Sequence, residues 1–196
     1  MDVIRHYDLL IDEGNDPFRD PPQLSSYMDK WDGEKFIRLL NLTGNERVLE
    51  IGIGTGRLAV RVLPKCREFI GIDISPKTIE RAKENLHEFK NASLICGDFL
   101  EYSPKLAFDV LYSSLALMHF EDKYAFIRKV YSLLNYGGVL VLSIDKNKDE
   151  FLDMGTRRLR IYPDDPNTIE GIIKEIGMKL ITIEETEFAY IFKAQK

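Results

Sequence analysis

Apolar residues form short uninterrupted runs that alternate with stretches in which they recur at helical spacing. Uninterrupted runs predict strands buried on both faces, because a half-exposed strand alternates apolar with polar residues. Five such runs lie at residues 48–51, 69–72, 93–96, 108–112 and 139–144. Helical spacing predicts helices at residues 58–63, 76–89 and 127–134. The alternation of strand and helix predicts right-handed crossovers and a parallel sheet with helices on both faces.

The C-terminal part of the chain departs from this alternation. Asp165 and Pro166 predict the start of a helix, which Gly177 ends. Two strand-like runs follow at residues 178–183 and 188–192, and the link between them permits only a hairpin. We therefore predict an α/β fold, a doubly wound, mostly parallel seven-stranded sheet with an antiparallel C-terminal hairpin.

The first 33 residues differ from the rest of the chain in charge. Eight acidic and three basic side chains there account for the whole net charge of −5. Residues 12–22 are rich in turn formers, with short helices expected within 24–31 and at 34–40. We expect residues 1–33 to form a weakly packed, mobile acidic cap on a domain at residues 34–196. The neutral remainder disfavours duplex nucleic acid as a partner.

The composition is that of a folded globular protein, with 44% hydrophobic and 30% charged residues. Cys66 and Cys96 are too few for a disulfide framework and lack metal-ligand spacing. No apolar run reaches the roughly 18 residues that a membrane helix needs, and the first residues do not resemble a signal peptide. We expect a cytoplasmic protein with no membrane partner and no metal.

A glycine-rich loop follows the first predicted strand. From Glu50 to Gly56 the chain reads Glu-Ile-Gly-Ile-Gly-Thr-Gly, and such a loop brings backbone N–H groups close to a ligand. Asp73 ends the second strand, where a carboxylate can accept both hydroxyls of a ribose, and Asp98 ends the third. Because the carboxyl ends of parallel strands share one edge of a sheet, we expect these groups around one ligand.

Two other classes of nucleotide-binding protein have glycine loops that differ from this one. The dinucleotide fingerprint requires glycine where this chain has Arg57, which disfavours an NAD-dependent oxidoreductase. No Lys-Ser/Thr pair follows the glycines, which excludes a phosphate-loop NTPase. A non-catalytic cofactor-binding or interaction module stays open, because fold alone does not fix activity.

As a set, these segments resemble the class I S-adenosylmethionine-dependent methyltransferases. The resemblance covers residues 45–194, and its motifs lie at 50–56, 71–74, 97–99, 108–110 and 134–138. It implies a Rossmann-like methyltransferase fold, S-adenosyl-L-methionine as the cofactor and methyl transfer as the reaction. The hairpin ending is also typical of that family.

The resemblance also implies roles for individual residues. Glu50, Gly52 and Gly54 would line the methionine and ribose part of the cofactor, and Asp73 would hold the ribose hydroxyls. Around the adenine, the implied residues are Ile74, Asp98 and Phe99. Ser113 and Ser114, expected just past the fourth strand, would lie near the aminocarboxylate or serve as plain loop residues.

The sequence indicates less about the methyl acceptor than about the cofactor. After the fourth predicted strand there is no Asn/Asp-Pro-Pro-aromatic motif of base-methylating enzymes, no acid matching the metal-dependent catechol type, and no cysteine of the cytosine-5 type. We therefore expect a small-molecule acceptor, and no particular oligomeric state is indicated. The candidate walls of its pocket are Tyr7, Tyr27, Met28 and Trp31, and the candidate polar contacts are Arg157, Arg158 and Tyr162.

His119 is the histidine closest to the expected reaction site. It follows the fourth predicted strand by a few residues, whereas His6 and His87 lie elsewhere in the chain. A neutral imidazole can accept a proton from an acceptor at cellular pH, so His119 is a candidate catalytic base. A structural role in packing or hydrogen bonding is the alternative.

Overall fold

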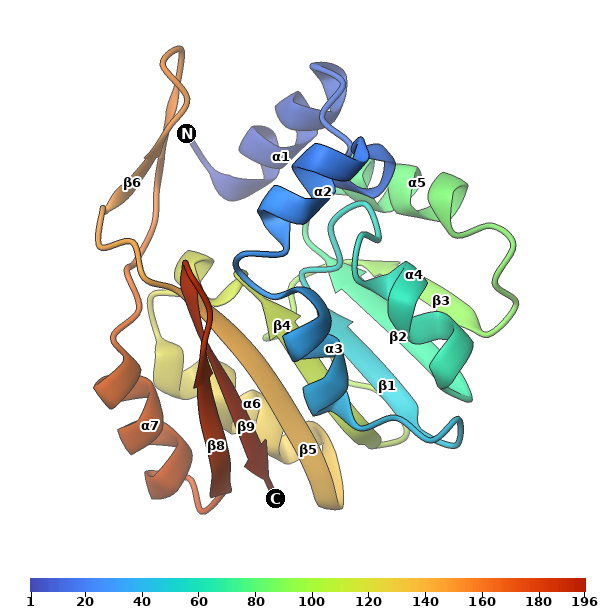
Figure 1. Ribbon diagram of the computed structural model, residues 1–196, viewed down its shortest axis with the longest axis vertical. Helices are drawn as coiled ribbons and strands as arrows, with labels where there is room; N and C mark the ends of the chain where they lie inside the picture. The colour runs from blue at the N-terminus through green and yellow to red at the C-terminus, as the bar shows by residue number, and fades with distance from the viewer.

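A seven-stranded sheet runs through the middle of the protein in the computed structural model, which describes residues 1–196 (Figure 1). The strand order is β3-β2-β1-β4-β5-β9-β8. The strands are β1 (Arg47–Ile51), β2 (Glu68–Asp73), β3 (Ala92–Cys96), β4 (Phe108–Ser114), β5 (Leu134–Asp145), β8 (Lys179–Glu185) and β9 (Ala189–Gln195). The first five are parallel, and β9 pairs antiparallel with both β5 and β8. The predicted fold class is confirmed.

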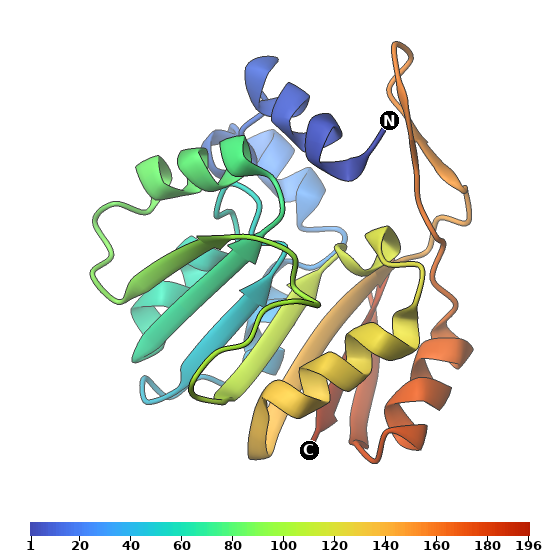
Figure 2. The same ribbon diagram turned by 180° about the vertical axis from the view of Figure 1, so that it is seen from behind.

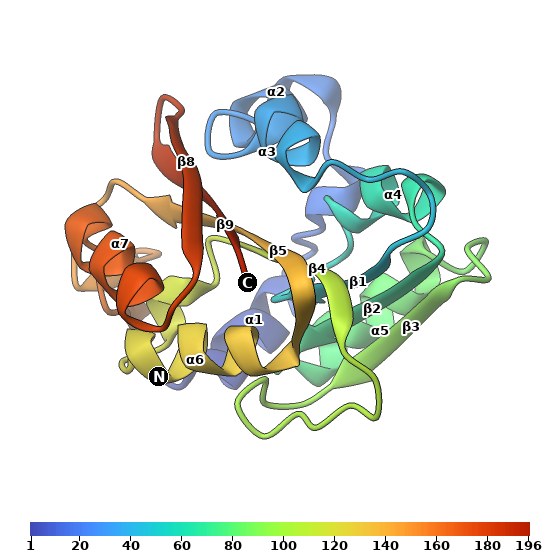
Figure 3. The same cartoon turned by 90° about the horizontal axis from the view of Figure 1, so that it is seen from below.

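Helices cover both faces of this sheet, and each strand supplies alternate residues to each face. On one face lie α3 (Gly33–Leu40), α4 (Ala59–Val62) and α5 (Pro76–Asn85), and on the other α6 (Lys123–Leu133) and α7 (Pro166–Glu175). Figure 3 shows α3 and α4 on one side of the strands and α6 and α7 on the other. Within β1, Val48 belongs to the first core, while Leu49 and Ile51 belong to the second. Burial on both faces explains why the strands are apolar throughout.

Several helix ends follow the predicted signals. The Ser75 side chain accepts a hydrogen bond from the Thr78 N–H, and the Asp165 side chain accepts one from the Thr168 N–H. A proline follows each of these caps, so both helices begin where the sequence indicates.

Other boundaries differ from the prediction. The sequence predicts a helix to residue 134 and a strand from residue 139, but α6 ends at Leu133 and β5 begins at Leu134, so that the strand contains both Gly137 and Gly138. A Cβ on Gly138 would lie 2.9 Å from the carbonyl oxygen of Asn135, so this glycine permits a close approach within the strand. The fourth strand continues through Ser114, because its pairing with β5 extends to Ser143.

Two covers at the carboxyl edge of the sheet contain secondary structure that was not predicted, although a cap of residues 1–33 was expected. One is α1 (Val3–Asp12), which lies above the carboxyl ends of the strands (Figure 2) and leads through η1 (Pro17–Arg19) to α2 (Pro22–Met28). The other is a small hairpin of β6 (Phe151–Asp153) and β7 (Arg158–Arg160). Between β4 and α6 the 3-10 turn η3 (Leu117–His119) lies below them, and η2 (Leu63–Lys65) extends α4. None of the helices has the length and apolar character of a membrane span.

Candidate active site

A cavity of about 390 Å³ lies at the carboxyl edge of the sheet, beneath α1. Its lining comes from the glycine loop, the ends of β2, β3 and β4, the η3 turn and the N-terminal segment. The nine site residues of our prediction all line it: Glu50, Gly52, Gly54, Asp73, Ile74, Asp98, Phe99, Ser114 and His119. Residues from widely separated segments are thus brought to one place, as the parallel strand ends require.

The glycine loop has a shape that other residues would not adopt. Gly52 and Gly54 have φ values of 74° and 57°, in the left-handed region that glycine adopts readily. A Cβ on Gly52 would lie 2.6 Å from the Cβ of Ala116, so the loop after β4 packs directly against it. A Cβ on Gly54 would meet no protein atom within 4 Å, which leaves its backbone open to a molecule in the cavity.

Asp73 is fixed in place by two backbone N–H groups, one from the glycine loop and one from the residue that caps α5. Its Oδ2 accepts a hydrogen bond of 3.0 Å from the Gly54 N–H, and its Oδ1 accepts one of 3.0 Å from the Ser75 N–H. Burial raises the pKa of Asp73, and the bonds from Ser75 and Gly54 oppose that shift. Each carboxylate oxygen keeps a further lone pair for a ligand hydroxyl.

Asp98 and Phe99 occupy contrasting places beside Asp73. Asp98 is exposed, and its Oδ1 accepts a hydrogen bond of 2.8 Å from the Leu100 N–H. Phe99 is buried, with its ring 5.1 Å from that of Phe126 and 6.5 Å from that of Phe120. An aromatic wall and an exposed acceptor at one end of the cavity suit a flat heterocycle with an amino group.

Glu50 is buried at the bottom of the cavity. It is 3% exposed, and the hydroxyl of Tyr112 donates a hydrogen bond of 2.7 Å to its Oε2. Burial raises the pKa of Glu50 to about 8, although the Tyr112 bond and the charge of Arg57 act in the opposite direction. In the ligand-free protein the group is therefore mostly protonated at neutral pH.

This burial predicts a pH dependence of stability. The folded-state pKa of Glu50 lies above the ordinary value of 4.5, so its contribution to stability is complete below pH 4.5 and is lost as the pH rises to about 8. In that window the free energy of unfolding of the ligand-free protein should fall, relative to that of Glu50→Gln, by about 1.4 kcal/mol per pH unit. Urea unfolding of both proteins across the window measures this difference. Parallel curves would contradict it.

A second buried carboxylate, which the sequence did not reveal, joins the cap to the cavity. Asp32 is 1% exposed, and it binds the guanidinium of Arg57 through both oxygens. Its Oδ2 also accepts a hydrogen bond of 2.7 Å from Ser114 Oγ. Arg57 and Ser114 both line the cavity, so Asp32 fixes two polar groups there. The expectation that Ser113 faces the same ligand is wrong, because its hydroxyl is buried and donates to Ile51 O.

Tyr7 and His119 meet across the cavity. The Tyr7 hydroxyl lies 2.7 Å from His119 Nε2, and the two rings are edge-on with centroids 5.4 Å apart. His119 Nδ1 is buried with no hydrogen-bond partner. Burial, together with the charges of His6 and Lys123, lowers the pKa of His119 to about 4, so the imidazole is neutral at cellular pH. Burial and the charge of Asp73 raise the pKa of Tyr7.

The predicted walls of an acceptor pocket are only partly correct. Tyr7 and Met28 line the cavity, but Tyr27 and Trp31 pack against Phe188 at the β8–β9 turn. The indole of Trp31 also donates a hydrogen bond of 3.0 Å to Asp145 Oδ2, which fixes it away from the cavity.

None of the predicted polar contacts lines the cavity; these are Arg157, Arg158 and Tyr162. The Arg157 guanidinium pairs with the carboxylate of Glu13, which joins the β6–β7 hairpin to the end of α1. Arg158 pairs with Asp153 across the same hairpin at 3.3 Å. Arg157 thus holds the hairpin to α1, and Arg158 acts within the hairpin.

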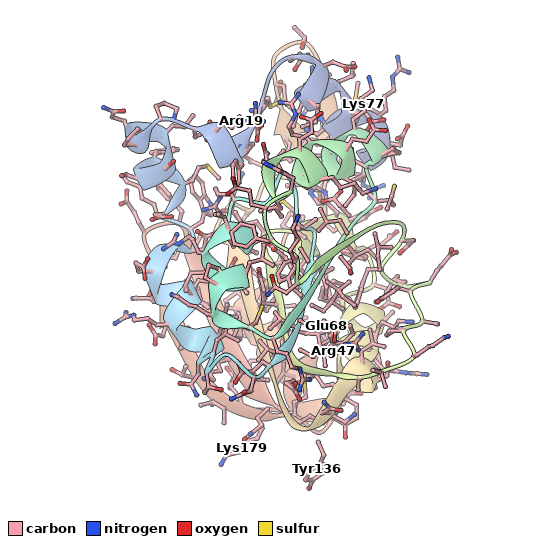
Figure 4. The ribbon with its side chains drawn as sticks, turned by 90° about the vertical axis from the view of Figure 1, so that its right-hand side faces the viewer. Arg19, Arg47, Glu68, Lys77, Tyr136 and Lys179 are labelled. Carbon is pink, nitrogen blue, oxygen red and sulfur yellow. The ribbon has the colours of Figure 1, made fainter.

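Acidic residues of the N-terminal segment meet basic residues of the domain. The Asp8 carboxylate accepts hydrogen bonds from Ser75 Oγ and the Lys77 N–H at 2.7 and 3.2 Å. Asp12 pairs with Lys77 Nζ at 2.6 Å, and Figure 4 labels Lys77 where α1 and α5 lie side by side. Further pairs join Asp16 to Arg81, Asp29 to Arg61 and Asp32 to Arg57. The acidic surplus of the segment is thus used to attach it over the cavity.

The fold and the cavity define a class. The sheet order, with its one antiparallel strand, and a glycine loop followed by two strand-end carboxylates belong to Rossmann-like domains that bind a nucleoside-containing cofactor. The chain belongs to the methyltransferase-domain family, whose sequence model matches residues 42–195. The family expected from the motifs is confirmed.

Individual relatives agree with this assignment. The chain is 33% identical over 106 residues to malonyl-[acyl-carrier protein] O-methyltransferase 1 of Ilyobacter polytropus, a match that covers 53% of this chain and 40% of that protein. An uncharacterized methyltransferase of Staphylococcus carnosus is 27% identical, with 97% of this chain and 94% of that protein covered. The chain therefore spans less than half of the first relative and nearly all of the second.

A solved structure shows the same fold. The N-methyltransferase NodS from Bradyrhizobium japonicum, in complex with S-adenosyl-L-homocysteine, has a TM-score of 0.71 at 20% identity. The match covers 97% of both chains, so the N-terminal segment lies within the shared fold.

Proposed function

We propose that this protein is an S-adenosyl-L-methionine-dependent methyltransferase with a small-molecule acceptor. One observation carries the proposal: the eight residues expected to bind the cofactor, drawn from the ends of four strands, surround a single cavity. Family membership supports the reaction class, and the bound product of the NodS complex supports the cofactor. The O-methyltransferase relative acts on a protein-bound group, so the acceptor is the part of the proposal that most needs a direct test.

The residues present fit the cofactor. Asp73 has a free lone pair on each oxygen for the two ribose hydroxyls, and Gly54 leaves open space beside its backbone. Phe99 and Ile74 provide apolar surface for the adenine, and Asp98 can accept a bond from its amino group.

Three polar groups at the other end of the cavity suit the aminocarboxylate; they are Glu50, Arg57 and Ser114. A cofactor ammonium beside Glu50 favours the ionised carboxylate, because opposite charges stabilise each other in a buried site. Arg57, which Asp32 fixes, is placed to donate to the cofactor carboxylate. Ser114 donates its one hydroxyl proton to Asp32, so its oxygen is an acceptor that suits the cofactor ammonium.

S-adenosylmethionine, when bound, supplies a methyl group on a cationic sulfur. The protein's own contribution is to orient the acceptor and to take up its proton. Tyr7 and His119 are the residues proposed to take up the proton. The Tyr7 oxygen takes up the proton that the methylated substrate releases. At the same time the Tyr7 hydroxyl gives its own proton to His119 Nε2. A weak base suffices, because the acceptor proton becomes acidic as the acceptor atom gains positive charge.

A thermal-shift panel tests the cofactor class. The melting temperature should rise with S-adenosylmethionine and with S-adenosylhomocysteine, and it should not change with NAD or NADP. A rise with NAD alone would overturn the proposal in favour of an oxidoreductase. A rise with the S-adenosyl compounds but no methyl transfer to any acceptor in a broad screen would favour the non-catalytic module.

We propose further that residues 1–33 act as a movable cap. No member of the buried apolar core comes from this segment, and its attachments include many single hydrogen bonds and ion pairs, of which exposed ion pairs contribute about 0.2–1 kcal/mol each. Amide hydrogen exchange in residues 1–31 should therefore slow when S-adenosylhomocysteine is added. Equal protection with and without the compound would count against a cap that opens.

A cytoplasmic location is also proposed. Cys66 and Cys96 are both free, and Cys96 is exposed, which suits a reducing compartment. Fractionation of the source cells, followed by immunodetection of this chain, would test the location.

A further inference from the structure

The η3 turn that carries His119 is held by the segment after the β6–β7 hairpin. The Met118 carbonyl accepts a hydrogen bond of 2.8 Å from the Tyr162 N–H. Met118 also packs with Leu159 and Ile161 in a small buried cluster of its own. The turn is therefore fixed by residues that lie far along the chain from it.

Lys123 completes this attachment with two hydrogen bonds and one ion pair. Its Nζ donates to the carbonyl oxygens of Leu117 and Tyr162, each at 2.8 Å, and pairs with Asp164 Oδ1 at 2.7 Å. The Lys123 side chain is 12% exposed and that of Asp164 only 1%. One buried cation thus joins the first residue of the η3 turn to the segment at residues 162–164.

His119 has little else to orient it. A histidine that handles protons usually has its second ring nitrogen bound to an acceptor, which fixes the ring and its tautomer. Here Nδ1 has no partner, and the single polar contact of the ring is the one with Tyr7. The position of the imidazole therefore depends on the backbone turn that carries it.

We propose that Lys123 is the positioning residue that holds His119 against Tyr7. The proposal rests on the function proposed for His119, and it gives Lys123 a role that requires no contact with cofactor or acceptor, since Lys123 does not line the cavity. When the contacts of Lys123 with Leu117, Tyr162 and Asp164 are lost, the η3 turn becomes free to move. The Tyr7–His119 contact is then lost, while the cofactor site stays intact.

The contact can be measured without any acceptor, by the ¹⁵N resonances of the His119 ring in the full chain with S-adenosylhomocysteine. Tyr7→Phe removes the hydroxyl and should shift the Nε2 resonance in the otherwise unchanged protein. In a Lys123→Met/Asp164→Asn background, the same substitution should shift it by less than about half as much. Both partners are replaced because Lys123→Met alone would leave a buried unpaired carboxylate.

Two further variants make the result decisive. Arg128→Met, an exposed residue of the same helix, should leave the full effect of Tyr7→Phe. If the double variant does not fold, Lys123→Arg replaces it. The pair with Asp164 is kept, but the planar guanidinium does not reproduce the two bonds to the Leu117 and Tyr162 carbonyls, and the effect should again fall. An undiminished effect of Tyr7→Phe in either folded variant would overturn the proposal.

Failure of the proposed function has a different signature. If His119 is not the base, the shift of its Nε2 resonance on Tyr7→Phe still depends on Lys123. In that case, however, Lys123→Arg and Tyr7→Phe leave turnover unchanged. The spectroscopic and kinetic measurements thus separate the positioning of His119 from its chemical role.

Discussion

Replacing His119 by alanine is expected to lower turnover by roughly 10²–10⁴-fold, the usual range for loss of a general base, with cofactor affinity unchanged. Under the proposed function, His119 takes up the proton through its 2.7 Å contact with Tyr7. Its neutral state at cellular pH leaves Nε2 able to accept a proton, since burial lowers its pKa to about 4. Release of S-adenosylhomocysteine with an acceptor found by screening measures turnover, and calorimetry measures cofactor affinity.

Two further variants test the interpretation of this result. Tyr7→Phe should also lower turnover, because it removes the hydroxyl that relays the proton. His87→Ala should not, because His87 is exposed and lies just beyond α5, far along the chain from the cavity lining. A structural role of His119 would give the reverse pattern, a lower melting temperature of His119→Ala with most of the turnover retained.

Replacing Asp73 by alanine is expected to weaken the binding of S-adenosylmethionine by at least tenfold. The carboxylate would accept two ribose hydroxyls, and hydrogen bonds to a charged group are worth about 1.5–3 kcal/mol each, while tenfold corresponds to about 1.4 kcal/mol. Calorimetric titration measures the affinity directly. Unchanged binding would remove the ribose assignment.

Asp73 also holds the backbone of Gly54 and Ser75, so the effect needs a control for local disorder. Asp73→Asn keeps an acceptor oxygen at the same place and should lie between the wild type and Asp73→Ala in affinity. Asp165→Ala is the control outside the cavity, where an exposed carboxylate also accepts a hydrogen bond from a backbone N–H, that of Thr168, and it should leave the affinity unchanged. A melting temperature of ligand-free Asp73→Ala close to that of the wild type would assign the loss to the ligand.

The sequence predicts those parts of the fold that are determined by residues close together in the chain. The inner strands are uninterrupted apolar runs because both faces are buried, and α5 and α7 begin at side-chain caps followed by proline. Gly52 and Gly54 were recognisable because their backbone conformations require glycine. The edge along which the strand-end residues gather then follows from parallel topology alone.

The parts that escaped prediction depend on contacts between distant residues. Strands β6 and β7 are three residues each and are held by the Arg157–Glu13 pair and a small core at Leu159, so no long apolar run marks them. The same holds for Asp32 with Arg57, and for Tyr7 with His119, which are separated by 25 and 112 positions. Side chains of these types are common on surfaces, and only the folded chain shows that they meet.

The location of the buried core has a consequence for which residues can be substituted during evolution. Every fully buried apolar side chain lies at or after Phe36, whereas Val3, Tyr7, Pro17 and Met28 line the cavity from the segment before it. Substitutions at Val3, Pro17 and Met28 would alter the shape and polarity of the cavity without creating voids in the interior. Under the proposed function, the choice of acceptor would depend partly on a stretch of the chain that the scaffold does not need for its core, so selection could change the acceptor at small cost to stability.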